Sequence, residues 1–78
     1  MERSNLENLV TIYVSLLDEG TPCSRPTLAE SVGDGLFRLL ETPNYDPQDE
    51  HWEFPPGSVV RTITKKHERQ DYLLAIKA

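Results

Sequence analysis

Few residues in this 78-residue chain have side chains suited to catalysis. Nucleophilic catalysis needs a thiol or hydroxyl with a base within hydrogen-bond reach. Cys23 is the only thiol, and His51 and His67 are the only histidines that could serve it. Neither spacing matches a catalytic motif, and Ser58 lacks the strand–turn–helix context that exposes a serine nucleophile. The sequence therefore predicts no catalytic residue and a protein that is not an enzyme.

Asp46, Asp49, Glu50 and His51 form the densest group of possible metal ligands. A calcium loop spaces its carboxylates regularly around an internal glycine, which this run lacks. An acid pair such as Asp49 with Glu53 would need a cleft that separates the two pKa values. No glycine-rich phosphate-binding loop is present. The sequence therefore predicts neither a metal nor another cofactor.

Carboxylates and aromatic rings gather in residues 41–53, which hold five acidic residues and no basic one. Aromatic rings supply contact area at an interface, and carboxylates select a basic partner. The pattern leaves Trp52 either in the core or half exposed with its N–H outward, whereas we expect Phe54 in the core. We predict that another protein with a basic surface binds this segment, and the predicted contact residues are Tyr45, Asp46, Asp49, Glu50 and Trp52, with Arg25 as the basic residue beside them.

The charge balance favours a protein partner over nucleic acid. The chain carries 13 acidic and 8 basic residues, a net charge of −5, whereas a phosphate-backbone binder needs clustered Lys and Arg. The sequence therefore predicts a small interaction module, such as an inhibitor, an immunity-type protein or an adaptor. The alternative is a nucleic-acid-associated regulatory barrel that uses a basic side, although no aromatic residues are interleaved there: Arg61, Lys65, Lys66, His67 and Arg69.

Location is predicted from three absences in the sequence. The N-terminus lacks the charged start and apolar run of a signal peptide. No apolar stretch approaches the ~20 residues of a membrane span. One cysteine cannot supply the paired disulfides that are typical of small secreted domains. We therefore expect a cytoplasmic protein with no membrane contact.

Seventy-eight residues make one domain, and glycine and proline clusters cut it into short strand-like pieces. We expect residues 1–8 to be flexible, residues 42–52 to form a long acidic loop and residues 65–71 to form a charged hairpin loop. The Gly33-Asp34-Gly35 run is typical of a tight hairpin, and Pro56-Gly57 of a type II turn. The predicted fold is mostly β, a small five-stranded SH3-like barrel, with strands at 9–17, 25–32, 36–41, 58–64 and 72–77 and a sixth short segment at 52–54.

Residues 6–17 are ambiguous. As a strand, they place Val10, Ile12, Val14 and Leu16 on one face, and three of these are β-branched. As a helix, they form an apolar stripe that begins at a Ser4–Glu7 capping box. The alternative fold is thus α+β, with this helix packed on a four-stranded antiparallel sheet. The strand-like sequence downstream favours the all-β reading.

The run WEFPPGSVVR at residues 52–61 is the most specific part of a pattern that also includes GDGLFR at 33–38. This pattern resembles that of a family of short, stand-alone bacterial proteins without an assigned function. The resemblance extends over about residues 11–76, and Ser24 stands where the family pattern has tryptophan. It implies a compact bacterial domain and carries over no catalytic residue. The matching segments are YV at 13–14, LDEGT at 17–21, RP at 25–26, AE at 29–30, GDGLFR at 33–38, DE at 49–50 and WEFPPGSVVR at 52–61.

Overall fold

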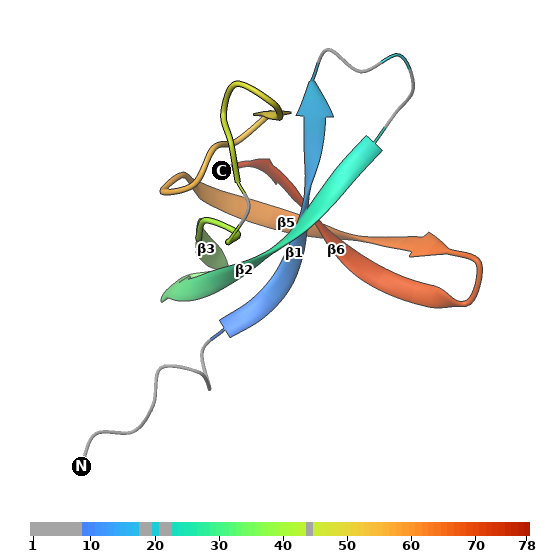
Figure 1. Ribbon diagram of the computed structural model, residues 1–78. Helices are drawn as coiled ribbons and strands as arrows, with labels where there is room; N and C mark the ends of the chain where they lie inside the picture. The colour runs from blue at the N-terminus through green and yellow to red at the C-terminus, as the bar shows by residue number, and fades with distance from the viewer. Residues whose placement is uncertain (1–8, 18–19, 21–22, 44) are drawn as a thin grey trace.

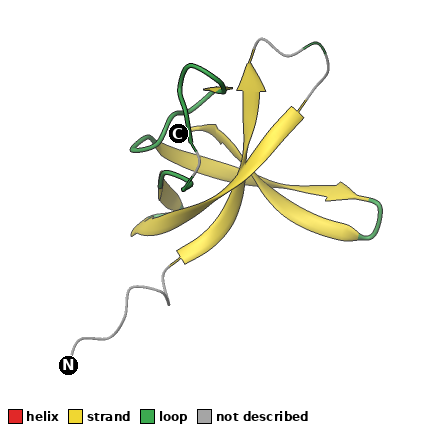
Figure 2. Cartoon of the chain, viewed as in Figure 1, coloured by secondary structure: helices red, strands yellow, loops and turns green. Residues whose placement is uncertain are grey.

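The computed structural model describes residues 9–17, 20, 23–43 and 45–78 and contains no helix among them. This confirms the mostly β fold (Figures 1 and 2). The predicted flexibility of residues 1–8 and the turn expected at residues 20–22 lie wholly or partly outside the described residues. The strands are β1 (Leu9–Leu17), β2 (Cys23–Gly33), β3 (Leu36–Leu39), β4 (His51–Trp52), β5 (Val59–His67) and β6 (Gln70–Lys77).

Five strands close into a ring in the order β1-β2-β3-β5-β6, which confirms the small five-stranded barrel. The ring closes at a parallel contact between β1 and β6, where Tyr13 pairs with Leu74. The other contacts around the ring are antiparallel. The two-residue strand β4 pairs with the end of β1, close to the sixth short segment predicted from the sequence.

The helix alternative is wrong for residues 9–17, which form β1; its first turn lies outside the described residues. Ile12 and Val14 are fully buried, while Thr11 and Leu17 are exposed. That alternation is the period of a strand. A helical stripe would have placed Leu17 in the core, so the β-branched residues decide the local structure.

Both tight turns predicted from glycine and proline are present. Gly33, Asp34 and Gly35 have positive φ angles of 99°, 58° and 76°, which turn β2 into β3. Gly57 has a φ of 93°, and the N–H of Ser58 donates to the carbonyl of Pro55 at 3.1 Å. This is the geometry expected of Pro56-Gly57 at the centre of a type II turn.

The predicted charged loop at residues 65–71 is wrong. β5 continues to His67 and β6 begins at Gln70, so only Glu68 and Arg69 form the turn. Lysines and polar residues indicate that a segment is exposed to solvent. They do not distinguish a loop from a two-stranded ribbon, because the ribbon is exposed on both faces as well. We call residues 64–73, which extend this hairpin beyond the barrel, the β5–β6 ribbon (Figure 1).

The barrel interior is apolar and draws on every strand. Thr27 is the one polar side chain among the described residues that is buried with the core, and its hydroxyl donates to the carbonyl of Leu40 at 2.6 Å. That bond offsets the cost of burying the hydroxyl. The buried apolar residues are Ile12, Val14, Ala29, Leu39, Trp52, Val60 and Ala75.

Candidate partner-binding loop

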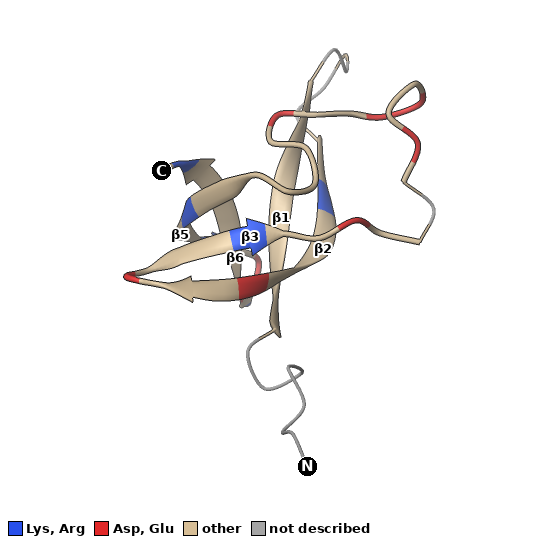
Figure 3. Ribbon diagram, turned by 90° about the vertical axis from the view of Figure 1, so that its left-hand side faces the viewer, with Lys and Arg blue, Asp and Glu red and all other residues tan. Residues whose placement is uncertain are grey.

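The acidic loop, residues 41–53, connects β3 to β4 and includes the two residues of β4. Four of its carboxylates belong to exposed residues, Glu41, Asp46, Asp49 and Glu53. Figure 3 shows the acidic positions spaced along this loop as it leaves the barrel. The fifth carboxylate, that of Glu50, lies closer to the barrel and has a different role.

Glu50 is held by two donors that come from different strands. The guanidinium of Arg25 forms an ion pair and a hydrogen bond with Oε2 of Glu50. The indole Nε1 of Trp52 donates to Oε1 at 3.0 Å. Both carboxylate oxygens are therefore engaged, as in the charge-assisted bonds that are the stronger class in proteins.

The sheet register explains why Arg25 and Trp52 meet at one carboxylate. Arg25 on β2 pairs with Val14 of β1, and Trp52 on β4 pairs with Leu16 of the same strand. Paired residues and residues two apart on a strand share a face. β1 thus places the two donors on one face, and Glu50 approaches them from the loop.

Trp52 lies in the core, which settles the two alternatives left open by the sequence. Its relative exposure is 2%. Tyr45 packs against it edge to face, with ring centroids 4.7 Å apart and an interplanar angle of 64°. Phe54 is partly buried against the same core, in agreement with its predicted place. Trp52 therefore holds the loop to the barrel and offers almost no surface to a partner.

The pKa of Glu50 lies below its ordinary value of 4.5. The hydrogen bond from Trp52 is the largest cause, followed by the hydrogen bond from Arg25, and the positive charge of Arg25 adds to them. Partial burial of the carboxyl opposes the shift by disfavouring its charged form. The charged form is thus the one that the barrel stabilises.

Asp46 organises the turn in the middle of the loop. Its carboxylate Oδ1 accepts a hydrogen bond from the N–H of Gln48 at 3.0 Å. Its carbonyl accepts from the N–H groups of Asp49 and Glu50, each at 2.9 Å. Asp46 therefore satisfies the loop's own backbone, as short acidic side chains commonly do in turns. At the far end, the N–H of Glu53 donates to the carbonyl of Ser15 at 2.8 Å.

Four of the six predicted contact residues come together in one cluster, Arg25, Tyr45, Glu50 and Trp52. Asp46 and Asp49 join it only through the loop backbone. Arg25 lies beside this loop, as predicted, and forms an ion pair with Glu50. No pattern in the sequence predicted the contact between Tyr13 and Tyr72, whose rings meet with centroids 5.0 Å apart on the other side of β1. They are far apart in the chain, so no spacing signal links them.

Cys23 and His51, one of the thiol–histidine pairs considered for catalysis, lie on opposite faces of the sheet. Cys23 pairs with Leu16, whereas His51 pairs with Leu17. Neighbouring residues of β1 point to opposite faces, so their partners do too. Among the described residues, no three His, Cys, Asp or Glu side chains are placed to hold a metal ion. None of the described segments is a helix long and apolar enough to cross a membrane.

Comparison with protein-family models, with curated proteins and with solved structures finds no match for this chain. The resemblance to short bacterial proteins therefore stays a prediction.

Proposed function

We propose that this chain is a non-enzymatic, cytoplasmic protein-interaction module that binds a basic protein surface through its acidic loop. An inhibitor, an immunity-type protein and an adaptor all fit this description. The proposal rests on one observation, the attachment of the loop to the barrel at Glu50. A long loop that is already fixed loses less conformational entropy when it binds a partner.

The attachment divides the six predicted contact residues into two roles. Trp52 and Arg25 hold Glu50, and Tyr45 covers the indole. Because of these contacts, the carboxylate of Glu50 and the ring of Trp52 are not available to a partner. Asp49 remains exposed for a partner, as does Asp46 beyond its bond to Gln48.

Exposed carboxylates on a fixed scaffold favour a basic partner. Glu41, Asp46, Asp49 and Glu53 are exposed, and the loop contains no basic residue to neutralise them. Such charges raise association rates and reject acidic competitors more than they add affinity. The expected complex therefore forms quickly and weakens as salt is added.

The experiment compares two charge reversals of equal size in the full chain. Asp49→Lys with Glu53→Lys changes exposed loop residues and spares the contacts of Glu50. Glu68→Lys with Asp71→Lys makes the same change in net charge at the tip of the β5–β6 ribbon. Each tagged protein is used to capture partners from the source cell, and each captured protein is identified and then titrated in purified form.

The loop double variant is expected to lose a basic partner that both the unchanged chain and the ribbon variant retain. A loss of affinity of at least about tenfold is expected, because two rim charges are reversed. If no protein is captured, or if the loop variant binds the purified partner as well as the control does, the proposal is wrong.

A further inference from the structure

The edge of β6 that faces away from β5 is hydrogen-bonded to another strand at only one described position. β6 pairs with β5 along its whole length, from Gln70 to Lys77. On its other side, it pairs with β1 where Tyr13 faces Leu74. In an antiparallel ladder, every second residue directs its N–H and C=O away from the partner strand. Within the described chain, residues 70–73 therefore present backbone donors and acceptors to no other strand.

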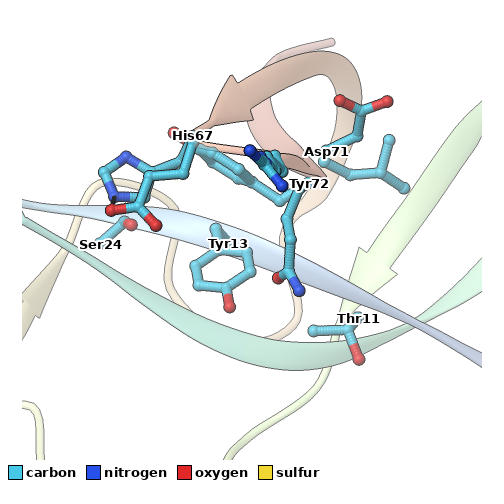
Figure 4. Close-up of a pocket in the computed structure, with 10 residues that line it drawn as sticks. Thr11, Tyr13, Ser24, His67, Asp71 and Tyr72 are labelled. Atoms are coloured by element: carbon cyan, nitrogen blue, oxygen red, sulfur yellow. Dashed lines mark ion pairs between the residues drawn. The ribbon is translucent and has the colours of Figure 1, made fainter.

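A groove runs along this edge (Figure 4). Four consecutive residues of β6, Gln70 to Leu73, line it. Successive side chains of a strand point to opposite faces, so a groove that touches all four follows the strand edge and not one face. Thr11, Tyr13 and Ser24 line it from β1 and β2. The groove volume of about 1250 Å³ exceeds the roughly 300–1,000 Å³ of small-molecule pockets, which favours a segment of a polymer.

The groove contains an aromatic pair. Tyr13 and Tyr72 pack edge to face at an interplanar angle of 66°, and both rings are half-buried. Beside them, an apolar row crosses four strands on the outer face of the barrel, from Pro26 through Tyr13 and Leu74 to Ile63. Ile63 retains 39% exposure. A strand laid along β6 would thus find apolar contacts as well as backbone partners.

Charge selects the kind of polymer. Residues 59–78 hold five of the eight basic residues and two of the thirteen acidic ones, a net charge of +3. The rest of the chain has three basic and eleven acidic residues, a net charge of −8. Arg69 and His67 line the groove together with Glu68 and Asp71. Lys66 lies opposite Asp71 in the ladder and offsets its charge, so the positive excess comes from the basic residues around the groove. A ligand that bears negative charge complements this region and is repelled by the remainder of the molecule.

The two edges of the β5–β6 ribbon differ in how they are protected. β5 carries Lys65 and Lys66, and edge lysines are a common defence against unwanted strand pairing. The facing segment of β6, residues 70–73, carries no lysine and includes Tyr72 and Leu73. Its one charge, Asp71, lies opposite Lys66 in the ladder. Residues 70–73 therefore lack the lysines that guard β5.

We propose that an extended, acidic peptide segment of a partner protein binds in this groove by adding a strand to the free edge of β6. Main-chain hydrogen bonds to residues 70–73 supply part of the affinity, and side-chain pockets supply the selectivity, as in other cases of strand addition. This surface lies on the opposite side of the barrel from the acidic loop (Figure 1). It does not depend on the function proposed for that loop.

The probe is a labelled peptide of alternating Glu and Val, titrated into the full chain while amide resonances are recorded. A peptide with Lys in place of Glu controls for the sign of charge, and a short oligothymidylate tests nucleic acid at the same surface. Arg69→Glu reverses a charge in the groove. Lys77→Glu makes the same charge change at the opposite end of β6.

The acidic peptide is expected to shift the amide resonances of residues 70–73 and to protect these amides from exchange. Arg69→Glu should lower the affinity for this peptide about tenfold, and Lys77→Glu should lower it much less. The proposal is overturned if the acidic peptide does not bind, or if its shifts map outside the groove. Equal loss in both variants also overturns it, because the effect would then be one of net charge. Tighter binding of oligothymidylate than of the peptide would assign the groove to single-stranded nucleic acid instead.

Discussion

The acidic loop and the β5–β6 ribbon both stand out from the barrel, on opposite sides of it (Figure 1), and both are rich in charge. In the loop, polar groups find partners inside the molecule, with Glu50 bound to Arg25 and Trp52 and with Asp46 bound to backbone N–H groups. In the ribbon, one strand edge has no strand along it within the described chain. A region's charge and aromatic content therefore do not say whether it is available to a partner.

The difference lies in what each region packs against. The loop returns to the barrel at β4, where Trp52 lies in the core and donates a hydrogen bond to Glu50. The ribbon continues past the point where β6 pairs with β1, and its one tyrosine, Tyr72, packs against Tyr13 of β1 and stays half-buried. The polar groups at the base of the loop are bonded within the molecule and its other acids are exposed. The edge of β6, in contrast, has backbone groups without a strand partner in the described part of the chain, which makes the ribbon the candidate for strand addition.

The largest expected effect contrasts the aromatic anchors of the two regions. Trp52→Ala should lower the free energy of unfolding by about 3–5 kcal/mol, because it removes a buried ring and leaves a cavity. Tyr72→Ala should cost only about 1 kcal/mol, since the ring is half exposed and loses mainly one aromatic contact. Urea denaturation followed by circular dichroism measures both.

If Trp52→Ala does not fold, Trp52→Phe keeps the comparison testable. It retains most of the ring and removes the N–H that donates to Glu50, so about 1–2 kcal/mol should be lost. Equal costs for the substitutions at Trp52 and Tyr72 would mean that the loop is no better anchored than the ribbon.

The next effect concerns Glu50 and is pH-dependent. Its folded-state pKa lies below 4.5, so its stabilising contribution is complete above pH 4.5 and is lost as the pH falls through the folded-state pKa. Glu50→Gln should cost about 1–2 kcal/mol at neutral pH, a figure that allows for solvent screening at the half-exposed Arg25. The gap between the unchanged chain and Glu50→Gln should shrink in acid.

Asp49→Asn is the matched control for Glu50→Gln. Asp49 is the adjacent acid and is exposed, so its substitution should change stability by less than about 0.5 kcal/mol at any pH. A gap for Glu50→Gln that stays constant from neutral to acid pH would show that the charge of Glu50 does not hold the loop.

Local patterns in the sequence were enough to predict the barrel. Alternation placed Ile12 and Val14 inside, and the Gly33–Gly35 and Pro56–Gly57 turns have the φ angles that their residues favour. Local patterns failed at the ribbon, where charged residues suggested a loop. A charged composition predicts that a segment is exposed to solvent, but it does not predict secondary structure. A two-stranded ribbon is exposed on both faces, so its composition resembles that of a loop.

The candidate sites needed information that no local pattern holds. The acids and aromatic rings of the loop are close in sequence, so they could be predicted as a group. The burial of Trp52 could not, because it follows from the pairing of β4 with β1, which are distant in the chain. The Tyr13–Tyr72 pair and the open edge of β6 likewise follow from the way the ring closes at a single β1–β6 contact. Those features are properties of the topology.

The smallest expected effect acts on the ribbon alone. Glu68 has a φ of 58°, the left-handed region that costs a side-chain-bearing residue more than it costs glycine. Glu68→Gly should therefore stabilise the chain by about 0.5 kcal/mol, after the entropy that glycine loses on folding is subtracted. Arg69→Gly, in the same turn but outside that region, gains nothing from glycine and should destabilise the chain.

Neither variant should alter the fluorescence of Trp52, because the turn and the acidic loop lie on opposite sides of the barrel. A change in that fluorescence would show that the two regions are coupled, and the contrast between an anchored loop and an independent ribbon would then have to be abandoned.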